Sequence, residues 1–266
     1  MRKINTVFIS HGGGPLPVLG DPGHAEMIST LKKLAEELPR PKAILVISAH
    51  WEANHPTVTS ASKPGMMYDY EGFPDEAYQL QYPSPGEPEL ADKVVSALMD
   101  AGIAAESSPE RPYDHGLYTP LMLMYPEADI PAIQLSLVKG LDPDEHLRIG
   151  EALQGLDYDD LLIIGSGFSF HNMRAFFIPE SPDMHAANAA FQNWLEETCM
   201  SKELPEEERR TRLQHWAEAP SARYCHPREE HLLPLHVCYG IAGRAADEYI
   251  ATTILGKASG MYAWTA

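Results

Sequence analysis

Residues 6–14 read TVFISHGGG, a short apolar run that ends in a histidine and three glycines. The apolar part is continuous and partly β-branched, which is typical of a parallel strand covered on both faces. Two later segments repeat this arrangement. Residues 43–49 (AILVISA) precede His50, and residues 161–165 (LLIIG) lead within a few residues to His171. Three such segments predict neighbouring strands of one sheet.

The rest of the chain alternates between strand-like and helix-like segments. Ile130–Val138 is a further apolar run, and residues 248–255 and 259–264 are candidates for closing strands. This alternation predicts an α/β fold with a mostly parallel central sheet and helices on both faces. The length fits a single domain, residues 1–266. Helices are predicted at about 24–38, 88–101, 118–125, 142–156, 184–200, 205–217 and 228–241.

Composition excludes several classes of protein. Lys and Arg number 20 and Asp and Glu number 38, so the formal net charge is −18. This balance argues against binding to nucleic acid or to an anionic membrane surface, both of which need clustered cations. No apolar run approaches the length of a membrane span. The odd number of cysteines, three, and the absence of a Cys-x-x-Cys pair argue against a disulfide framework. We therefore expect a reduced, cytoplasmic protein.

Histidines follow three of the predicted strands. In open α/β sheets, ligands bind beyond the carboxyl ends of the strands, so His11, His50 and His171 are expected to converge there. Neutral imidazole is a good ligand for Zn(II) or Fe(II) and also titrates near neutral pH. The pattern predicts a metal site at this edge of the sheet. The alternative for each single histidine is a structural role through hydrogen bonds.

Two other segments add candidate site residues. Residues 226–231 (HPREEH) contain a proline that favours a helix start at residue 227, so Glu230 and His231 would lie in its first turns. Either side chain is a candidate third ligand, because two histidines and one carboxylate bind non-haem Fe(II). In the segment at Asp114 and His115, the aspartate is a candidate helix cap and the histidine a candidate substrate contact.

Taken in order, these motifs resemble the class III extradiol ring-opening dioxygenases, in particular their DOPA 4,5-dioxygenase branch. The resemblance runs from about residue 6 to residue 240 and is carried by SHGGGP (10–15), SAHW (48–51), DHGLYTPL (114–121), GSGFSFHN (165–172) and HPREEHLLPL (226–235). It implies an α/β domain and non-haem Fe(II), often replaced by Zn(II) in the purified protein. His11, His50 and His231 match the family's metal ligands. Because a glutamate is the third ligand in the protocatechuate branch, Glu230 stays open.

The resemblance also implies roles for two further histidines and a reaction. His171 matches an acid–base histidine near the metal, which is also a possible metal ligand, and His115 matches a histidine that faces the substrate. The implied reaction opens the ring of a catechol with O₂ to give a muconic semialdehyde. The partners would be a small aromatic substrate and O₂, with a homo-oligomer left open. The bulky segment Phe168-Ser169-Phe170 puts the family's familiar substrate in doubt.

Other functions use the same residues. A zinc-dependent hydrolase would hold a metal-bound water on the same histidines, and a binding protein would carry a metal or an aromatic molecule there. A serine hydrolase is disfavoured, because the Gly-x-Ser-x-Gly pentapeptide of that class does not occur. The long segment Ala61–Pro88 is rich in Pro, Gly and Tyr, and it is expected either to wall the pocket or to pack its own aromatic residues.

Overall fold

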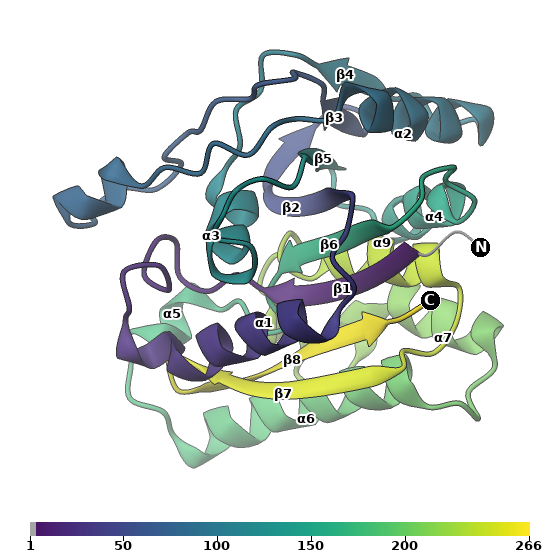
Figure 1. Ribbon diagram of the computed structural model, residues 1–266. Coiled ribbons are helices and arrows are strands. Elements are labelled where there is room, and N and C mark those ends of the chain that lie inside the picture. The colour runs from purple at the N-terminus through teal and green to yellow at the C-terminus, as the bar shows by residue number, and fades with distance from the viewer. Residues whose placement is uncertain (1–3) are drawn as a thin grey trace.

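The computed structural model describes residues 4–266, whose strands form one eight-stranded sheet (Figure 1). The strand order is β4-β3-β5-β2-β6-β1-β8-β7. β1, β6, β2 and β5 run parallel to one another, whereas β8 pairs antiparallel with both β1 and β7. The strands are β1 (Ile4–Ser10), β2 (Ala43–Ala53), β3 (Thr57–Thr59), β4 (Glu106–Ser108), β5 (Ala132–Val138), β6 (Leu161–Gly167), β7 (Glu248–Ile254) and β8 (Lys257–Trp264).

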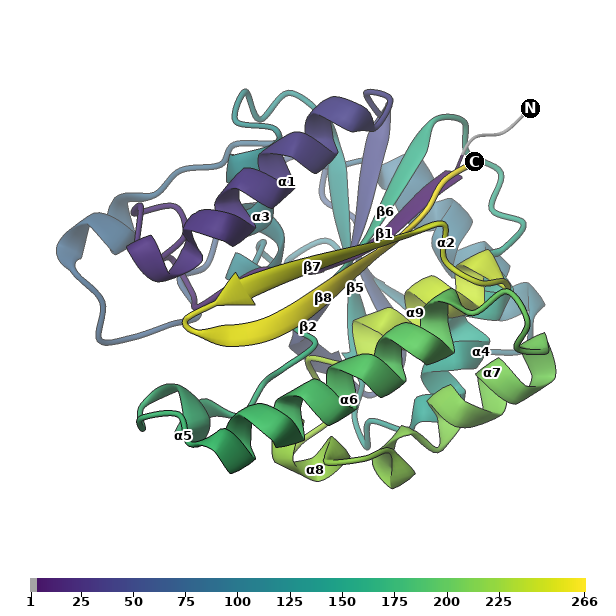
Figure 2. The ribbon, with the colours of Figure 1, turned by 90° about the horizontal axis from the view of Figure 1, so that it is seen from below.

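Helices cover both faces of this sheet (Figure 2). α1 and α3 lie on one face, and α2, α4, α6, α7 and α9 lie on the other. The predicted α/β class with a mostly parallel sheet is therefore confirmed. The helices are α1 (Ala25–Glu37), α2 (Pro88–Asp100), α3 (His115–Met124), α4 (Pro143–Leu153), α5 (Met173–Phe176), α6 (Pro182–Met200), α7 (Glu206–Gln214), α8 (Ala222–Cys225) and α9 (Leu233–Ala242), with short 3-10 turns η1 (Pro22–His24), η2 (Asp75–Gln79) and η3 (Trp216–Glu218).

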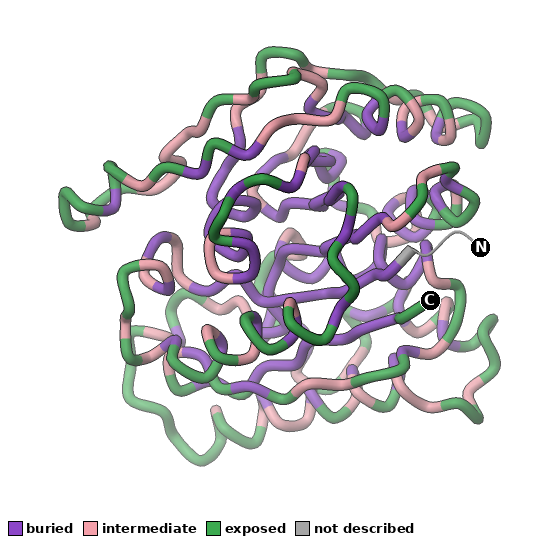
Figure 3. The backbone as a smooth tube through the Cα atoms, viewed as in Figure 1, coloured by how far each residue is buried: buried purple, intermediate pink, exposed green. Residues whose placement is uncertain are grey.

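The central strands are buried along almost their whole length (Figure 3). In β2, Ile44 and Val46 join one buried apolar cluster, whereas Leu45 and Ile47 join a second. Successive side chains of a strand point to opposite faces, so two apolar faces require two helical layers. This is why the strand sequences read as continuous apolar runs instead of alternating ones.

Two predicted helix starts differ from the structure. The helix expected from residue 228 begins only at Leu233, because Pro234 and not Pro227 occupies its first turn. α3 begins at His115, earlier than expected, and includes Pro120. The Asp114 carboxylate accepts a hydrogen bond from Gly116 N at 3.0 Å, so the proposed helix cap is present. β3 and β4 were not predicted, since each has only three residues.

No helix within residues 4–266 combines the length and the apolar character that crossing a bilayer requires.

Candidate metal centre

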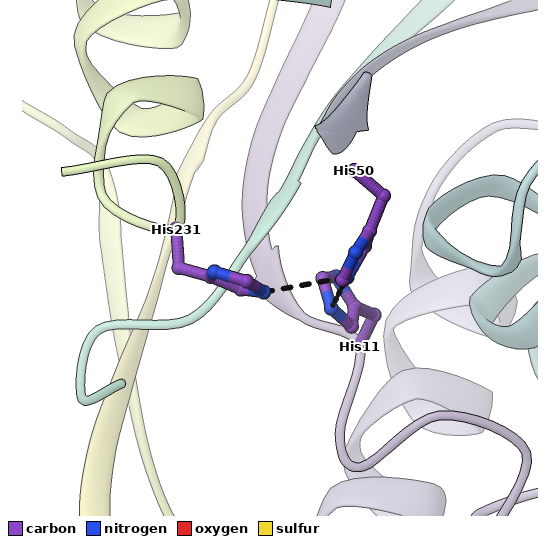
Figure 4. A group of neighbouring side chains, drawn as sticks. All are labelled: His11, His50 and His231. Carbon is purple, nitrogen blue, oxygen red and sulfur yellow. Dashed lines mark hydrogen bonds between the residues drawn. The ribbon is translucent and has the colours of Figure 1, made fainter. Parts of the chain in front are cut away.

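Three histidines from separate elements point toward one another (Figure 4). His11 follows β1, His50 lies in β2, and His231 lies in the turn before α9. The Nε2 atoms of His11 and His50 are 2.9 Å apart, and those of His231 and His50 are 3.3 Å apart. Pairing of β2 with β5 is irregular between Ser48 and Glu52, and such bulges redirect side chains. His50 lies within this irregularity.

Hydrogen bonds on the far side of two rings fix which nitrogen faces the centre. Ser166 Oγ donates to the carbonyl oxygen of Gly116 at 2.5 Å, so it accepts at 3.0 Å from Nδ1 of His11. Glu230 Oε1 lies 3.0 Å from Nδ1 of His231, and a carboxylate only accepts. Both rings therefore carry their proton on Nδ1, and their Nε2 lone pairs face His50.

This arrangement fits a transition-metal ion. Nε2 of His50 can donate its hydrogen to only one of the two lone pairs that face it, those of His11 and His231. At least one of these buried lone pairs is therefore without a hydrogen-bond donor. Two ligand nitrogens that each lie about 2.0–2.1 Å from one ion, at an angle of about 90–110°, are about 2.8 to 3.4 Å apart, a range that includes both separations given above. Imidazole is a suitable ligand for both Zn(II) and Fe(II). His11, His50 and His231 are thus a set of residues that could hold the metal.

The protonation of the cluster favours metal binding. Burial, reinforced by the neighbouring imidazoles, lowers the pKa of His11 and of His50 well below the usual value for histidine. The same causes lower the pKa of His231 to about 3. All three rings are therefore neutral at physiological pH, and metal ions bind the neutral imidazole.

The segment Gly165-Ser166-Gly167 brings β6 and the His231 turn into close contact. A Cβ atom on Gly167 would lie 2.1 Å from the carbonyl oxygen of His231, and one on Gly165 would lie 2.7 Å from that of Pro234. Phe168 N donates to the same His231 carbonyl at 2.9 Å. The two glycines therefore allow His231 to approach the strand ends, while the serine between them orients His11.

Gly167→Ala is expected to destabilise the protein by about 1–3 kcal/mol and to weaken metal binding, because the added methyl group overlaps the His231 backbone. Urea unfolding and metal content of the purified variant measure the two effects. Gly155→Ala is the matched control, since no atom lies within 4 Å of the Cβ it would add. Equal stability and metal content in both variants would contradict the prediction.

His115 lies on one side of the cluster, next to His50. Their ring centroids are 3.8 Å apart, and the ring of Tyr70 lies 5.7 Å from that of His115. Nδ1 of His115 is 2.9 Å from Asp69 Oδ2, so the two side chains form a close ion-pair contact. Asp69 Oδ1 accepts from His115 N at 3.0 Å. Burial alone would raise the pKa of Asp69, but the interactions with His115 outweigh it and lower that pKa.

His171 lies on the other side, stacked on His231. Their ring centroids are 3.4 Å apart and the planes are inclined by 16°. Its Nδ1 lies 3.2 Å from Glu230 Oε1. Burial alone would raise the pKa of Glu230, but its contacts with His171 and His231 outweigh burial and hold the pKa well below its usual range. Glu230 therefore faces the Nδ1 side of His231. His231 groups with His11 and His50, and Glu230 groups with His171 and His231 in a second set of possible ligand atoms.

A buried carboxylate, Asp114, supports the site from behind. It accepts from Ser48 Oγ at 2.8 Å, from Arg111 Nη2 at 3.2 Å and from Gln134 Nε2. Ser48 in turn accepts from His50 N at 3.2 Å. Burial raises the pKa of Asp114. The sequence identified Asp114 as a helix cap but gave no sign of its link to His50.

The side chains that orient the histidines were not evident from the sequence. They are Ser166 for His11, Asp69 for His115 and Glu230 for His231. Ser166 lies inside a quoted motif, but its contact with His11 joins residues far apart in sequence, and Asp69 lies in a segment expected only to be a loop. The bulky Phe168 and Phe170 are 2% and 0% exposed and belong to the core. Other buried histidines outside the cluster bond backbone groups, as His226 does with Ser169 O at 2.8 Å.

A mostly parallel sheet with a histidine cluster beyond its strand ends defines an α/β protein with a candidate metal centre. The family model described as the catalytic LigB subunit of aromatic ring-opening dioxygenase matches residues 6–264. The chain therefore belongs to this family of aromatic ring-opening dioxygenases, and the predicted resemblance to the class III extradiol enzymes is confirmed.

Relatives agree with this assignment. A 4,5-DOPA dioxygenase extradiol of Beta vulgaris is 41% identical over 90% of this chain and 87% of its own. A protein of Hapsidospora irregularis called dioxygenase tasH is 37% identical over 96% of this chain and 85% of its own. The crystal structure of an uncharacterized protein of Escherichia coli K12 superposes with a TM-score of 0.74 at 27% identity, covering 97% and 98% of the two chains. Similarity to the DOPA dioxygenase branch of the family thus extends over nearly the whole chain.

Proposed function

We propose that this protein is a non-haem metal-dependent extradiol dioxygenase that opens the ring of a catechol-type aromatic with O₂ to a muconic semialdehyde. The convergence of His11, His50 and His231, with further histidines on two sides, carries the proposal. We expect Fe(II) to be the working metal, and Zn(II) to replace it in purified material. When bound, the metal would bring the catechol and O₂ together and pass electron density between them.

The flanking histidines supply proton transfer and substrate contacts. With Nδ1 held at Glu230, Nε2 of His171 is the atom that accepts a proton from a catechol hydroxyl and later returns it to the departing oxygen. His115, held by Asp69, positions the aromatic substrate from the opposite side of the cluster. Tyr70, whose hydroxyl donates to Ala77 O at 2.7 Å, adds a flat apolar surface beside His115.

The reaction is tested by oxygen consumption. The protein is reconstituted anaerobically with Fe(II), a panel of catechols is added, and O₂ uptake is followed together with the yellow absorbance of a semialdehyde. Equal molar uptake of O₂ and formation of product support the proposal. The zinc hydrolase alternative predicts ester or amide cleavage with Zn(II) and no O₂ uptake, and a binding protein predicts no turnover with any catechol.

The segment Ala61–Pro88 is proposed to set the choice of catechol. The Phe73 ring packs over Gly14, in the loop that follows His11, and lies 5.4 Å from the Tyr70 ring. Phe73→Leu keeps apolar volume but removes a flat face, so we expect a change in the ranking of KM values across the catechol panel. An unchanged ranking would show that this segment only packs its own aromatic residues.

Several broader expectations stay predictions. One sheet joins strands from residue 4 to residue 264, which supports a single catalytic domain over residues 1–266. The cysteines Cys199, Cys225 and Cys238 are all buried and unpaired, which is compatible with a cytoplasmic protein. The excess of acidic residues still argues against nucleic acid and anionic membranes as partners. Size-exclusion chromatography with light scattering measures whether the protein forms a homo-oligomer.

A further inference from the structure

One carboxylate oxygen serves two histidines that have different proposed roles. Glu230 Oε1 lies 3.0 Å from Nδ1 of His231 and 3.2 Å from Nδ1 of His171. The two rings stack face to face, so both Nδ1 atoms reach the same oxygen from adjacent planes. The glutamate side chain is only 13% exposed, and water therefore competes little for these contacts.

The second carboxylate oxygen is held from outside the cluster. Arg228 Nη1 lies 3.3 Å from Glu230 Oε2, and the same guanidinium forms a two-pronged pair with Glu52, at 2.7 and 2.8 Å. Glu52 is two residues after His50 in β2. Arg228 therefore ties the turn that carries His231 to the strand that carries His50, with Glu230 between them.

An ionised carboxylate has no proton to donate, so Nδ1 of His231, which is hydrogen-bonded to it, carries the hydrogen, and Nδ1 of His171, 3.2 Å from the same oxygen, is placed to donate to it as well. In a neutral imidazole, Nε2 then has no hydrogen and presents a free lone pair. A carboxylate behind a metal-binding histidine fixes its tautomer and ring orientation in this way, and loss of such a partner typically weakens metal binding 10- to 100-fold. Here the same atom faces a proposed ligand and a proposed acid–base residue together.

We propose that Glu230 is a positioning residue that holds both His231 and His171 in the Nδ1–H tautomer, with Arg228 and Glu52 holding the carboxylate in place. This inference rests on the proposed function for the roles of the two histidines, but not for their tautomers. Glu230 thereby couples the metal-holding side of the site to its proton-transferring side. It acts through the two rings and is not itself a ligand of the metal.

The tautomers are measured directly in the unsubstituted protein. Long-range ¹H–¹⁵N NMR correlations distinguish Nδ1–H from Nε2–H histidines, and they are recorded on the metal-free protein and on protein loaded with Zn²⁺. We expect Nδ1–H for His231 and His171 in both forms. An Nε2–H tautomer of either residue in the metal-free protein would overturn the proposal. This measurement needs no substrate, so it is independent of the proposed reaction.

The coupling is measured with variants. Glu230→Ala is expected to weaken Zn²⁺ binding, followed by competition with a chelator, by about 10- to 100-fold and to lose the fixed tautomer of both rings. Glu230→Gln keeps one accepting oxygen, so its Zn²⁺ affinity is expected to lie between those of Glu230→Ala and the unsubstituted protein. Glu229→Gln is the matched control, because its carboxylate pairs with Arg223 instead, at 2.6 Å. Zn²⁺ affinity and tautomers in Glu230→Ala equal to those of the control would overturn the proposal. If Glu230→Ala does not fold, as judged by circular dichroism, the tautomers of the unsubstituted protein decide alone.

Discussion

His50→Ala is expected to purify without bound metal while keeping its fold. His50 is the middle member of the cluster, since its Nε2 is the one that approaches both His11 and His231. Loss of a partner behind a ligand already weakens metal binding 10- to 100-fold, so loss of a ligand itself should cost at least on the order of 100-fold. The side chain lies beyond the apolar part of β2 and contributes little to the core.

Metal content by elemental analysis and unfolding by circular dichroism separate the two effects. The control is His55→Ala, which removes an exposed histidine from the connection between β2 and β3. We expect the control to retain its metal and both variants to unfold near the midpoint of the parent. Normal metal content in His50→Ala would show that His50 is structural, and the assignment of the metal centre would fail.

Much of the fold could be predicted because short, continuous segments of the sequence carry the pattern of each buried strand. Parallel strands that are covered on both faces need continuous apolar runs, and residues 43–49 and 161–165 are such runs. The edge where ligands bind follows from strand direction alone, so histidines directly after two strands were expected to meet. His11 and His50 do meet, because β1 and β2 both pair in parallel with β6.

The support of the site could not be predicted, because it depends on contacts between distant segments. Ser166 orients His11 from β6, and Asp69 reaches His115 from a long loop. Pro227 predicts a first helical turn that would place His231 in a helix, but in the structure Pro234 occupies the first turn of α9 and His231 lies in the turn before it. This turn places Glu230 on the Nδ1 side of both His231 and His171.

His171→Ala is expected to keep most of its metal and to lose turnover by about 10²- to 10⁴-fold in kcat, with kcat/KM falling in parallel. The metal should stay because Glu230 still holds His231 when His171 is absent. The rate should fall because, within residues 4–266, His171 is the imidazole that stacks on His231 at the position of the proposed proton transfer. Added imidazole is expected to restore part of the rate, since it fits the space left by the ring.

The measurement pairs single-turnover kinetics with metal analysis, and it uses His185→Ala, an exposed histidine on α6, as the control. Comparison with His50→Ala then separates the two roles. If His171→Ala loses as much metal as His50→Ala, His171 belongs to the ligand set, and the proton must be moved by another group. If both metal and turnover are retained, the stacked ring is structural. Only a loss of turnover with the metal retained assigns proton transfer to His171, because the metal centre is then intact and the chemical step alone has changed.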